Sequence, residues 1–359
     1  MPRTESISAG SQGQKTSRQR KLSLRTKLLF AAGTAQEATV TAGGIVTIIY
    51  YNQVLGLSPS LCGLAFMVAM IFDAVSDPLI GAMSDNLKSR FGRRHPFMLF
   101  STIPLALGFY LLYQPLPGLS ETGLFIWLTG FSVVLRFGQT MYLVPHDALG
   151  AELTDDYDER SSIFGYNAVS QMILSMVFTG ILYYLLFPTT PEYENGLMNE
   201  PRYLLLSVVG AVTIIFSILV CSLGTMDQIP FLHDVDFSSK FIVKGYLSEV
   251  AKLLKNPSYL AICGSMMTVY IALGIINVVT PYAHLYVFEF TTEDMFWFGI
   301  AKLPGVFIAI PLLAVLTKRL EKKSIWMAVT IIVVTSCAIP FLFKMAGVFP
   351  AQGSGFDLL

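Results

Sequence analysis

Long apolar runs separated by short polar segments repeat along the whole chain. The runs cover residues 27–51, 61–84, 96–114, 123–149, 162–187, 203–225, 257–287, 295–317 and 324–348. Each run is long enough for an α-helix to cross the hydrocarbon core of a bilayer, which takes about 20 residues. The pattern therefore predicts an all-α membrane protein with about nine transmembrane helices.

The polar segments divide these runs into groups. Residues 1–26 are rich in Ser, Gln, Lys and Arg, which predicts a disordered cytoplasmic tail. The segment 226–256 contains an amphipathic stretch and predicts a cytoplasmic linker on the membrane surface between two helical bundles. We therefore expect a six-helix N-terminal bundle over 27–225 and a partial C-terminal bundle of about three helices over 257–359. The unequal counts suggest a symmetric second half that is cut short.

Composition agrees with a membrane protein and narrows its partners. Of the 359 residues 53% are hydrophobic and 13% are charged, whereas soluble domains average about 25% charged residues. The formal net charge is zero, which argues against a nucleic-acid partner. The sequence contains no phosphate-binding, zinc-protease or serine-hydrolase motif, so we expect neither an enzyme nor a bound cofactor.

Basic residues indicate the orientation in the membrane. All but four of the 24 Lys and Arg residues fall in the N-terminal tail and in alternate loops between the runs. Cytoplasmic loops are enriched in Lys and Arg, so we expect a multi-pass protein of the cell membrane (inner or plasma membrane) with a cytoplasmic N-terminus.

Two aspartates interrupt the second apolar run near its middle. Asp73 and Asp77 are four residues apart, a spacing that puts them on one face of a helix about one turn apart. An ionised group at this depth costs several kcal/mol unless it meets a cavity or a partner. Carboxylates suit Na⁺ or a proton, so we predict that these two residues bind one of these cations.

Other polar residues lie at a similar depth on other runs. Glu37 is in the first run and Arg136 is near the centre of the fourth, while Asn167 and Gln171 begin the fifth, one turn apart. We expect these four residues to line one polar cavity and to bind substrate. For Arg136 a fixed salt bridge between helices is the alternative, and Asp77 followed by Pro78 could satisfy carbonyls freed by a proline kink.

Charged residues also gather at the predicted cytoplasmic ends of the helices. A basic turn follows the second run, and an acidic turn follows the fourth run, where basic residues would be usual. We expect the two turns to pair when the cytoplasmic side closes; topology-setting charge and a solvated loop are the alternatives. The predicted gate residues are Asp85, Arg90, Arg93, Arg94, Asp155, Asp156, Glu159 and Arg160.

Four motifs together resemble one transporter family. They are Tyr50-Tyr-Asn-Gln-Val-Leu-Gly-Leu-Ser58, Asp73-Ala-Val-Ser-Asp-Pro-Leu-Ile-Gly81, Arg90-Phe-Gly-Arg-Arg94 and Asp155-Asp-Tyr-Asp-Glu-Arg160. The chain resembles the glycoside–pentoside–hexuronide:cation symporters, the melibiose-permease-like branch of the major facilitator superfamily. The resemblance covers the first six runs well and extends more weakly through residue 348.

The resemblance implies a fold and a mechanism. It implies twelve helices in two bundles, alternating access, cation binding by Asp73 and Asp77, and sugar contact at Glu37. Leu143 stands where the melibiose permease has a substrate-binding aspartate, and the usual basic residue near Asn167 is absent, which leaves the substrate open. Arg136 could partly replace that basic residue.

We therefore expect a monomeric secondary transporter that couples Na⁺ or H⁺ to the symport of a sugar, glycoside or sugar acid. A lysophospholipid symporter is the alternative within transport, because a related branch carries the same Asp-x-x-x-Asp-Pro pattern. A membrane sensor or scaffold that does not transport is the alternative from another class.

Overall fold

A computed structural model describes residues 21–348, except 88, 194, 233–254 and most of 302–321. The predicted tail up to residue 20 and the amphipathic stretch of the predicted linker therefore lie outside the described residues. Within them the chain is helical and forms two compact units. Unit 1 contains Met1–Phe178 and Met198–Val278, and unit 2 contains Thr179–Leu197 and Val279–Leu359.

The helices follow the predicted apolar runs closely. Those of the first six runs are α2 (Leu24–Ala31), α3 (Thr34–Ile49), α4 (Pro59–Asn86), α5 (His95–Leu112), α6 (Glu121–Glu152), α7 (Tyr157–Gly180) and α8 (Arg202–Gly224). The later ones are α10 (Pro257–Tyr282), α11 (Thr292–Ala301) and α13 (Lys322–Met345). Short 3₁₀ segments, η3 (Gly196–Met198) and η4 (Met226–Phe231), flank α8. The first helix, α2, begins inside the segment predicted to be the disordered tail.

Seven helices in the described part of the chain are long and apolar enough to cross a membrane. The first run is not among them and is divided into α2 and α3, and the eighth is described only over α11 and a few later residues. The predicted all-α membrane architecture is thus found, with an unpredicted break in the first helix.

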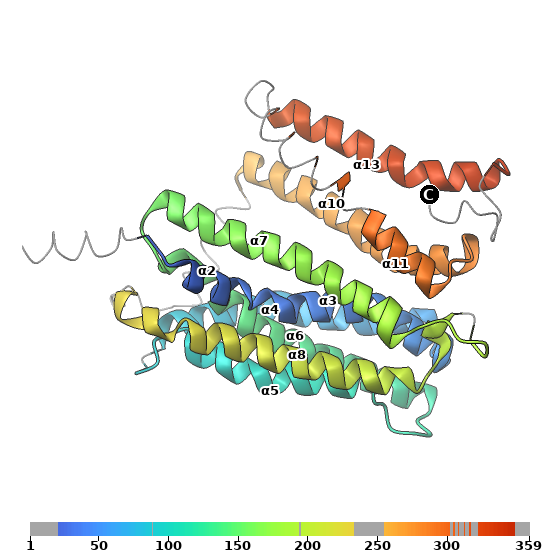
Figure 1. Ribbon diagram of the computed structural model, residues 1–359, viewed down its shortest axis with the longest axis horizontal. Coiled ribbons are helices and arrows are strands. Elements are labelled where there is room, and N and C mark those ends of the chain that lie inside the picture. Colours follow the sequence, from blue (N-terminus) through green and yellow to red (C-terminus); the bar gives the residue numbers. More distant parts are fainter. Residues whose placement is uncertain are drawn as a thin grey trace, which may run out of the picture. The chain divides into compact units, whose positions relative to one another are not determined.

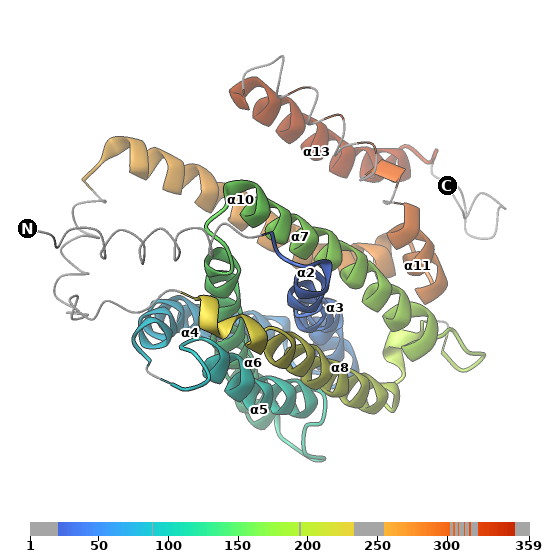
Figure 2. The same cartoon turned by 60° about the vertical axis from the view of Figure 1, so that its left-hand side comes forward.

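Helix α6 is central to the packing of unit 1. It packs against both α4 and α5, and α8 packs against α3 and α5 (Figures 1 and 2). Gly138 brings α6 against the backbone of α5, since a Cβ atom there would lie 2.6 Å from the Leu105 nitrogen. This close contact holds α6 in place while its opposite side faces α4.

At the break between α2 and α3, side chains from other helices donate hydrogen bonds to backbone carbonyls. Ser170 of α7 donates to the Ala31 oxygen at 3.1 Å. Ser217 of α8 donates to the Ala32 oxygen at 2.9 Å and lies 3.2 Å from the Gly33 oxygen. Irregular backbone is tolerated at membrane depth only when such partners are present. Hydrogen bonds from α7 and α8 thus stabilise the break within unit 1.

Three helices end in a π-helical turn, in which each amide bonds to the carbonyl five residues earlier. These turns are η1 (Tyr50–Val54) after α3, η2 (Ile181–Leu186) after α7 and η5 (Ala283–Val287) after α10. The closing bonds run from Leu55, Phe187 and Phe288 to the residues five positions before them, at 2.9–3.0 Å. The apolar pattern does not distinguish such a turn from a regular one.

Unit 2 joins the loop after α7 to the helices that follow α10. The Thr189 hydroxyl lies 3.1 Å from the Thr292 hydroxyl, and the Asn195 amide donates to the Phe290 oxygen at 3.5 Å. The rings of Tyr184 and Phe296 are 5.4 Å apart. Residues from the two predicted bundles therefore contact one another within this unit.

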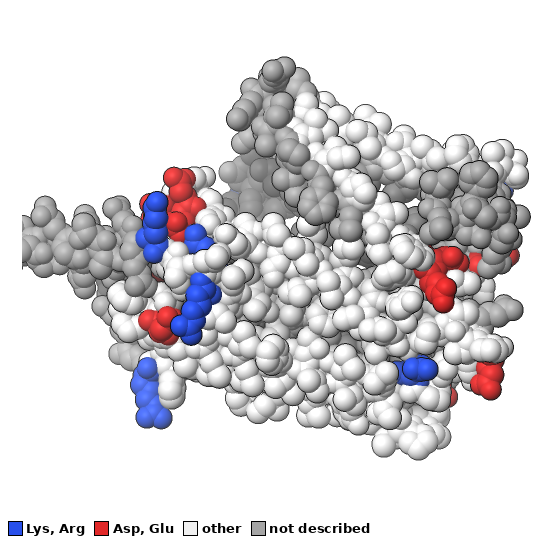
Figure 3. Space-filling model, in the orientation of Figure 1, with Lys and Arg blue, Asp and Glu red and all other residues white. Residues whose placement is uncertain are grey.

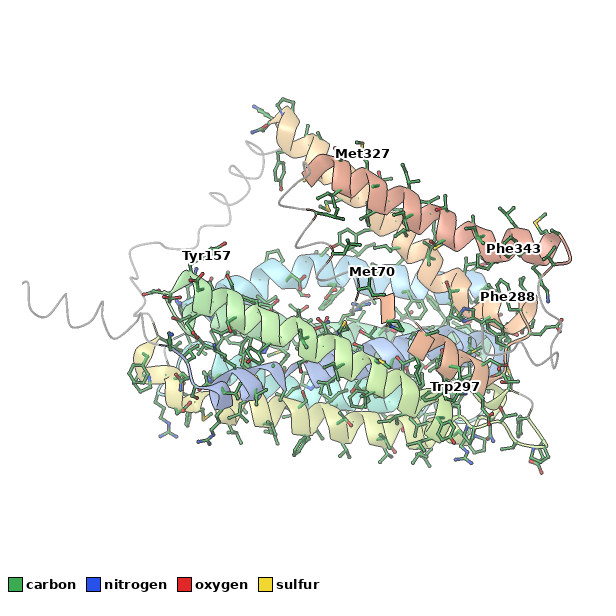
Figure 4. All side chains as sticks on the ribbon, turned by 45° about the horizontal axis from the view of Figure 1, so that its top comes forward. Met70, Tyr157, Phe288, Trp297, Met327 and Phe343 are labelled. Carbon is green, nitrogen blue, oxygen red and sulfur yellow. The ribbon has the colours of Figure 1, made fainter. Side chains whose placement is uncertain are left out.

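Large apolar side chains cover the outer helix faces. Met70 of α4 is 63% exposed, and Met327 and Phe343 of α13 are also exposed (Figure 4). In Figure 3 most of the visible charged side chains lie toward the ends of the helices, and the described surface between them is largely uncharged, with many exposed large apolar side chains. An exposed apolar surface between charged ends is expected of helices that face lipid.

Candidate functional site

Helix α4 carries the two aspartates predicted to bind a cation. Ser58 in extended conformation precedes Pro59 at the first position of the helix, where proline is well tolerated. The helix then continues through Pro78 to Asn86. Asp73 is 28% exposed at its side chain and Asp77 is exposed, so both carboxylates remain accessible from one side of α4.

The hydroxyl of Thr140 on α6 joins these two carboxylates. Its Oγ1 atom lies 2.9 Å from an Asp73 oxygen and 2.7 Å from an Asp77 oxygen. A hydroxyl has a single hydrogen and can donate it to only one carboxylate. The second close contact needs a proton on a carboxyl group or a cation between the oxygens. The arrangement of the three oxygens therefore suits a hard cation or a proton.

Arg136 lies one turn before Thr140 on α6. Its Nη1 atom is 3.7 Å from the second oxygen of Asp73, and its side chain remains 43% exposed. This distance corresponds to a loose, partly exposed ion pair, and such pairs contribute little to the stability of the protein. The geometry leaves part of the guanidinium accessible and is compatible with both the substrate-binding prediction and the salt-bridge alternative for Arg136.

Glu37 belongs to a second polar group in unit 1. The Gln171 amide of α7 is its hydrogen-bond partner, and Asp147 and His146 of α6 lie close enough to interact with its charge. Asn167, one turn before Gln171, has a buried Oδ1 atom without a hydrogen-bond partner among the described residues. Acceptors and amides of this kind can bind the hydroxyl groups of a polar substrate.

A charge network ties together the ends of three helices. Arg94 pairs with Asp85 at 2.9 Å and with Glu152, and Arg93 also pairs with Glu152. The Arg94 guanidinium also lies 3.5 Å from the Ser84 hydroxyl. Since Asp85 lies in α4 and Glu152 ends α6, the two arginines before α5 hold these helices together.

The other predicted gate residues lie outside this network. Glu159 pairs with Lys27 of α2 at 2.8 Å and accepts from the Leu22 amide. Asp156 accepts from the Glu159 amide at 2.9 Å, which caps the start of α7. The remaining three are Arg160, which donates to the Thr154 oxygen, Arg90, which lies over the adjacent Phe91 ring, and Asp155, which is exposed.

Sequence reasoning missed two central residues. Thr140 has no signal of its own, because threonine is common in apolar runs. Glu152 stands in the acidic turn that was predicted to meet the basic one, yet Asp155 and Asp156 were named as its pairing residues. Glu152 lies within one helical turn of the end of the fourth run, closer to it than Asp155 and Asp156, and this position is the signal that could have found it.

Comparison with known proteins identifies the family. A model of the family described as MFS/sugar transport protein matches residues 29–353, which is most of the chain. The chain belongs to this family. The predicted relation to the melibiose-permease-like branch of the major facilitator superfamily is thereby confirmed, and the family is one of transporters.

Three relatives of this MFS/sugar transport protein are named as symporters. An uncharacterized symporter of Synechocystis is 33% identical over 55% of this chain and 37% of its own length. The inner membrane symporter YicJ of Escherichia coli is 29% identical over 41% of this chain and 32% of its own. Sodium-dependent lysophosphatidylcholine symporter 1 of Xenopus tropicalis is 30% identical over 48% and 33%. The chain spans about a third of the length of these relatives.

Proposed function

We propose that the protein is a cation-coupled symporter in which Asp73, Asp77 and Thr140 bind the coupling cation, Na⁺ or H⁺. The observation that carries the proposal is the single Thr140 hydroxyl placed within 2.9 Å of both carboxylates. Without a cation or a proton, two negative groups would share one hydrogen in a region of low dielectric. The names of the relatives support symport as the activity of such a site.

The cargo we propose is a sugar, a glycoside or a sugar acid, contacted by Glu37, Gln171 and Asn167, with Arg136 next to the cation site. The sugar-transport description of the family supports this class. A second candidate is a lysophospholipid, because a sodium-dependent lysophosphatidylcholine symporter is among the relatives. We further propose that the protein acts as a monomer in the cell membrane with its N-terminus in the cytoplasm.

In the proposed cycle the cation neutralises the aspartates before the protein changes conformation. A loaded or an empty site can pass through the change, whereas cargo without the cation leaves uncompensated charge. The network of Arg93, Arg94, Asp85 and Glu152 would close the cytoplasmic side in one of the two states. Arg94 and Glu152 are largely buried in this network, whereas Asp85 is 54% exposed, so breaking the pairs to Glu152 carries the larger cost.

The test is uptake by protein reconstituted into vesicles. A Na⁺ gradient at clamped pH and a proton gradient without Na⁺ are applied separately, with a labelled glycoside or labelled lysophosphatidylcholine as cargo. We expect one gradient to drive accumulation, and Asp73→Asn or Asp77→Asn to abolish it.

Asp158→Asn is the matched control, because Asp158 is an exposed carboxylate of α7 outside both polar groups. It should accumulate cargo at the native rate. Undiminished gradient-driven uptake by both Asp73→Asn and Asp77→Asn would defeat the proposal. An absence of flux with every cargo and gradient would favour the sensor or scaffold alternative.

A further inference from the structure

His146 is a buried histidine that the proposed cation site does not use. Its side chain is only 2% exposed. The imidazole lies parallel to the Phe30 ring, with centroids 4.1 Å apart, and stacks on the Tyr142 ring at 5.2 Å. The ring is thus enclosed between two aromatic faces at the end of α2 and within α6.

The two ring nitrogens face acceptors that carry no hydrogen. Nε2 lies 3.2 Å from the Phe30 carbonyl oxygen, so the contact is favourable only if Nε2 carries a hydrogen. Nδ1 lies 3.5 Å from an Asp147 carboxylate oxygen, and the same reasoning puts a hydrogen there. With hydrogens on both nitrogens the ring is an imidazolium cation.

The surroundings of His146 supply the negative charge that a buried cation needs. Glu37 and Asp147 are the acidic groups that interact with it or with each other. The other titratable neighbours are Tyr142 and Cys221, and the Cys221 thiol lies 3.5 Å from the same Phe30 oxygen. Aromatic faces stabilise a cation, while burial opposes it, so the adjacent Asp147 carboxylate is the acidic group that offsets the cost.

We propose that His146 binds a proton that it shares with Asp147, forming a second ion site separate from Asp73 and Asp77. His146 follows Thr140 by six residues, which is about 9 Å along a helix. Asp147 is 65% exposed at its side chain, so the proton can reach His146 through this carboxylate. The ligand of this site is a proton and no metal ion.

Loss of this proton has a specific structural effect. The neutral ring can keep its hydrogen on Nε2, and the bond to the Phe30 oxygen next to the α2–α3 break then survives. The bare Nδ1 atom would face a carboxylate, and the two lone-pair groups would repel. Deprotonation therefore removes the attraction that holds Asp147 beside the ring, while the helix break keeps its support.

Nitrogen NMR of the full chain tests the proposal without any transport assay. The protein is labelled with ¹⁵N-histidine, and the chain has only four histidines. Variants H95Q, H233Q and H284Q remove the other three signals in turn, so that the assignment needs no change at His146. We expect nearly equal ring-nitrogen shifts for His146 at neutral pH, as in an imidazolium.

His95 is the matched internal control. It is equally buried, and its Nε2 atom pairs with the Thr225 hydroxyl at 3.0 Å. Its Nδ1 atom has no hydrogen-bond partner in the described part of the chain, and no carboxylate faces it there. His95 should therefore show the unequal nitrogen shifts of a neutral ring in the same spectrum.

Asp147→Asn supplies the second measurement. The asparagine keeps the size of the side chain and removes the charge, so the imidazolium signal of His146 should be lost at neutral pH. Unequal nitrogen shifts for native His146, or an imidazolium that persists in Asp147→Asn, would overturn the proposal. Neither result bears on Asp73 and Asp77, so the two proposals can fail separately.

Discussion

Among single residues, Thr140 makes the contact on which the cation site depends. Its hydroxyl is buried and lies between two carboxylates that are themselves accessible. The neighbouring Ser76 hydroxyl lies 3.4 Å from it, at the outer limit of hydrogen bonding. Thr140 therefore links α6 to both aspartates of α4.

Thr140→Ala should weaken cation binding. A hydrogen bond to a charged group contributes about 1.5–3 kcal/mol, which corresponds to roughly 10- to 100-fold in affinity. Thr140→Ser keeps the hydroxyl and should stay within a few-fold of the native protein. Titration calorimetry with the coupling cation in cation-free detergent measures both. Equal affinities for the alanine and serine variants would show that the hydroxyl is not a ligand.

The residue scale also shows where sequence reasoning succeeded and where it stopped. The spacing of Asp73 and Asp77 was sufficient to put both on one helix face, because helical periodicity is local. Their partner Thr140 is more than sixty residues away in the chain, and no local pattern marks it. Buried polar partners depend on which helices pack together, which the apolar runs do not encode.

Among the helices, the contact of α5 with α6 depends on glycine. At Gly138 a Cβ atom would lie 2.6 Å from one backbone atom of Leu105 and 2.8 Å from another, so no side-chain movement can relieve it. Gly130 lies in the same helix with no atom within 4 Å of its ideal Cβ position. The two positions form a natural pair for comparison.

Gly138→Ala should lower the free energy of unfolding by about 1–3 kcal/mol, the usual cost of overpacking. Gly130→Ala should be neutral or stabilising by up to about 1 kcal/mol, because alanine favours the helix. Unfolding by SDS titration in mixed micelles, followed by circular dichroism, measures both. A Gly138→Ala protein as stable as Gly130→Ala would contradict the close approach of the two helices.

The charge network at the helix ends leads to a second comparison. Glu152 has a side chain only 12% exposed and meets two arginines, whereas Asp85 is 54% exposed and meets one. Glu152→Gln should destabilise the protein by about 3 kcal/mol, since it leaves the buried Arg94 poorly compensated. Asp85→Asn should cost less than about 1 kcal/mol. The same SDS titration measures both variants, and a reversed order would argue that Asp85 is the principal partner.

The helices were predicted well as a set, but their irregularities were not. Apolar length predicts that a segment crosses the membrane, so α4 to α8 agree with the runs to within a few residues. No proline marks the break at Ala32–Gly33 in the sequence. Side chains of α7 and α8 donate hydrogen bonds to the carbonyl oxygens beside it. The groups that stabilise the break lie in those neighbours, and a single run cannot reveal them.

For the whole molecule, the distribution of Lys and Arg predicts which loops face the cytoplasm. In a protein whose four cysteines are replaced by alanine, Arg90→Cys should react with an impermeant maleimide only in inside-out vesicles. Leu116→Cys, in the exposed turn after α5, should react only from the outside of intact cells. Labelling of Arg90→Cys in intact cells would reverse the assigned orientation.

The loop after α7 pairs with residues beyond the predicted linker, through Thr189 with Thr292 and Asn195 with Phe290. The two halves of the chain would thus be held together by contacts that are remote in sequence from the predicted linker that connects them. Severing that tether at a protease site inserted within 233–254 should leave two fragments that travel together through size-exclusion chromatography in detergent. Fragments that separate under native conditions would mean that these contacts are too weak to hold the two halves of the chain together.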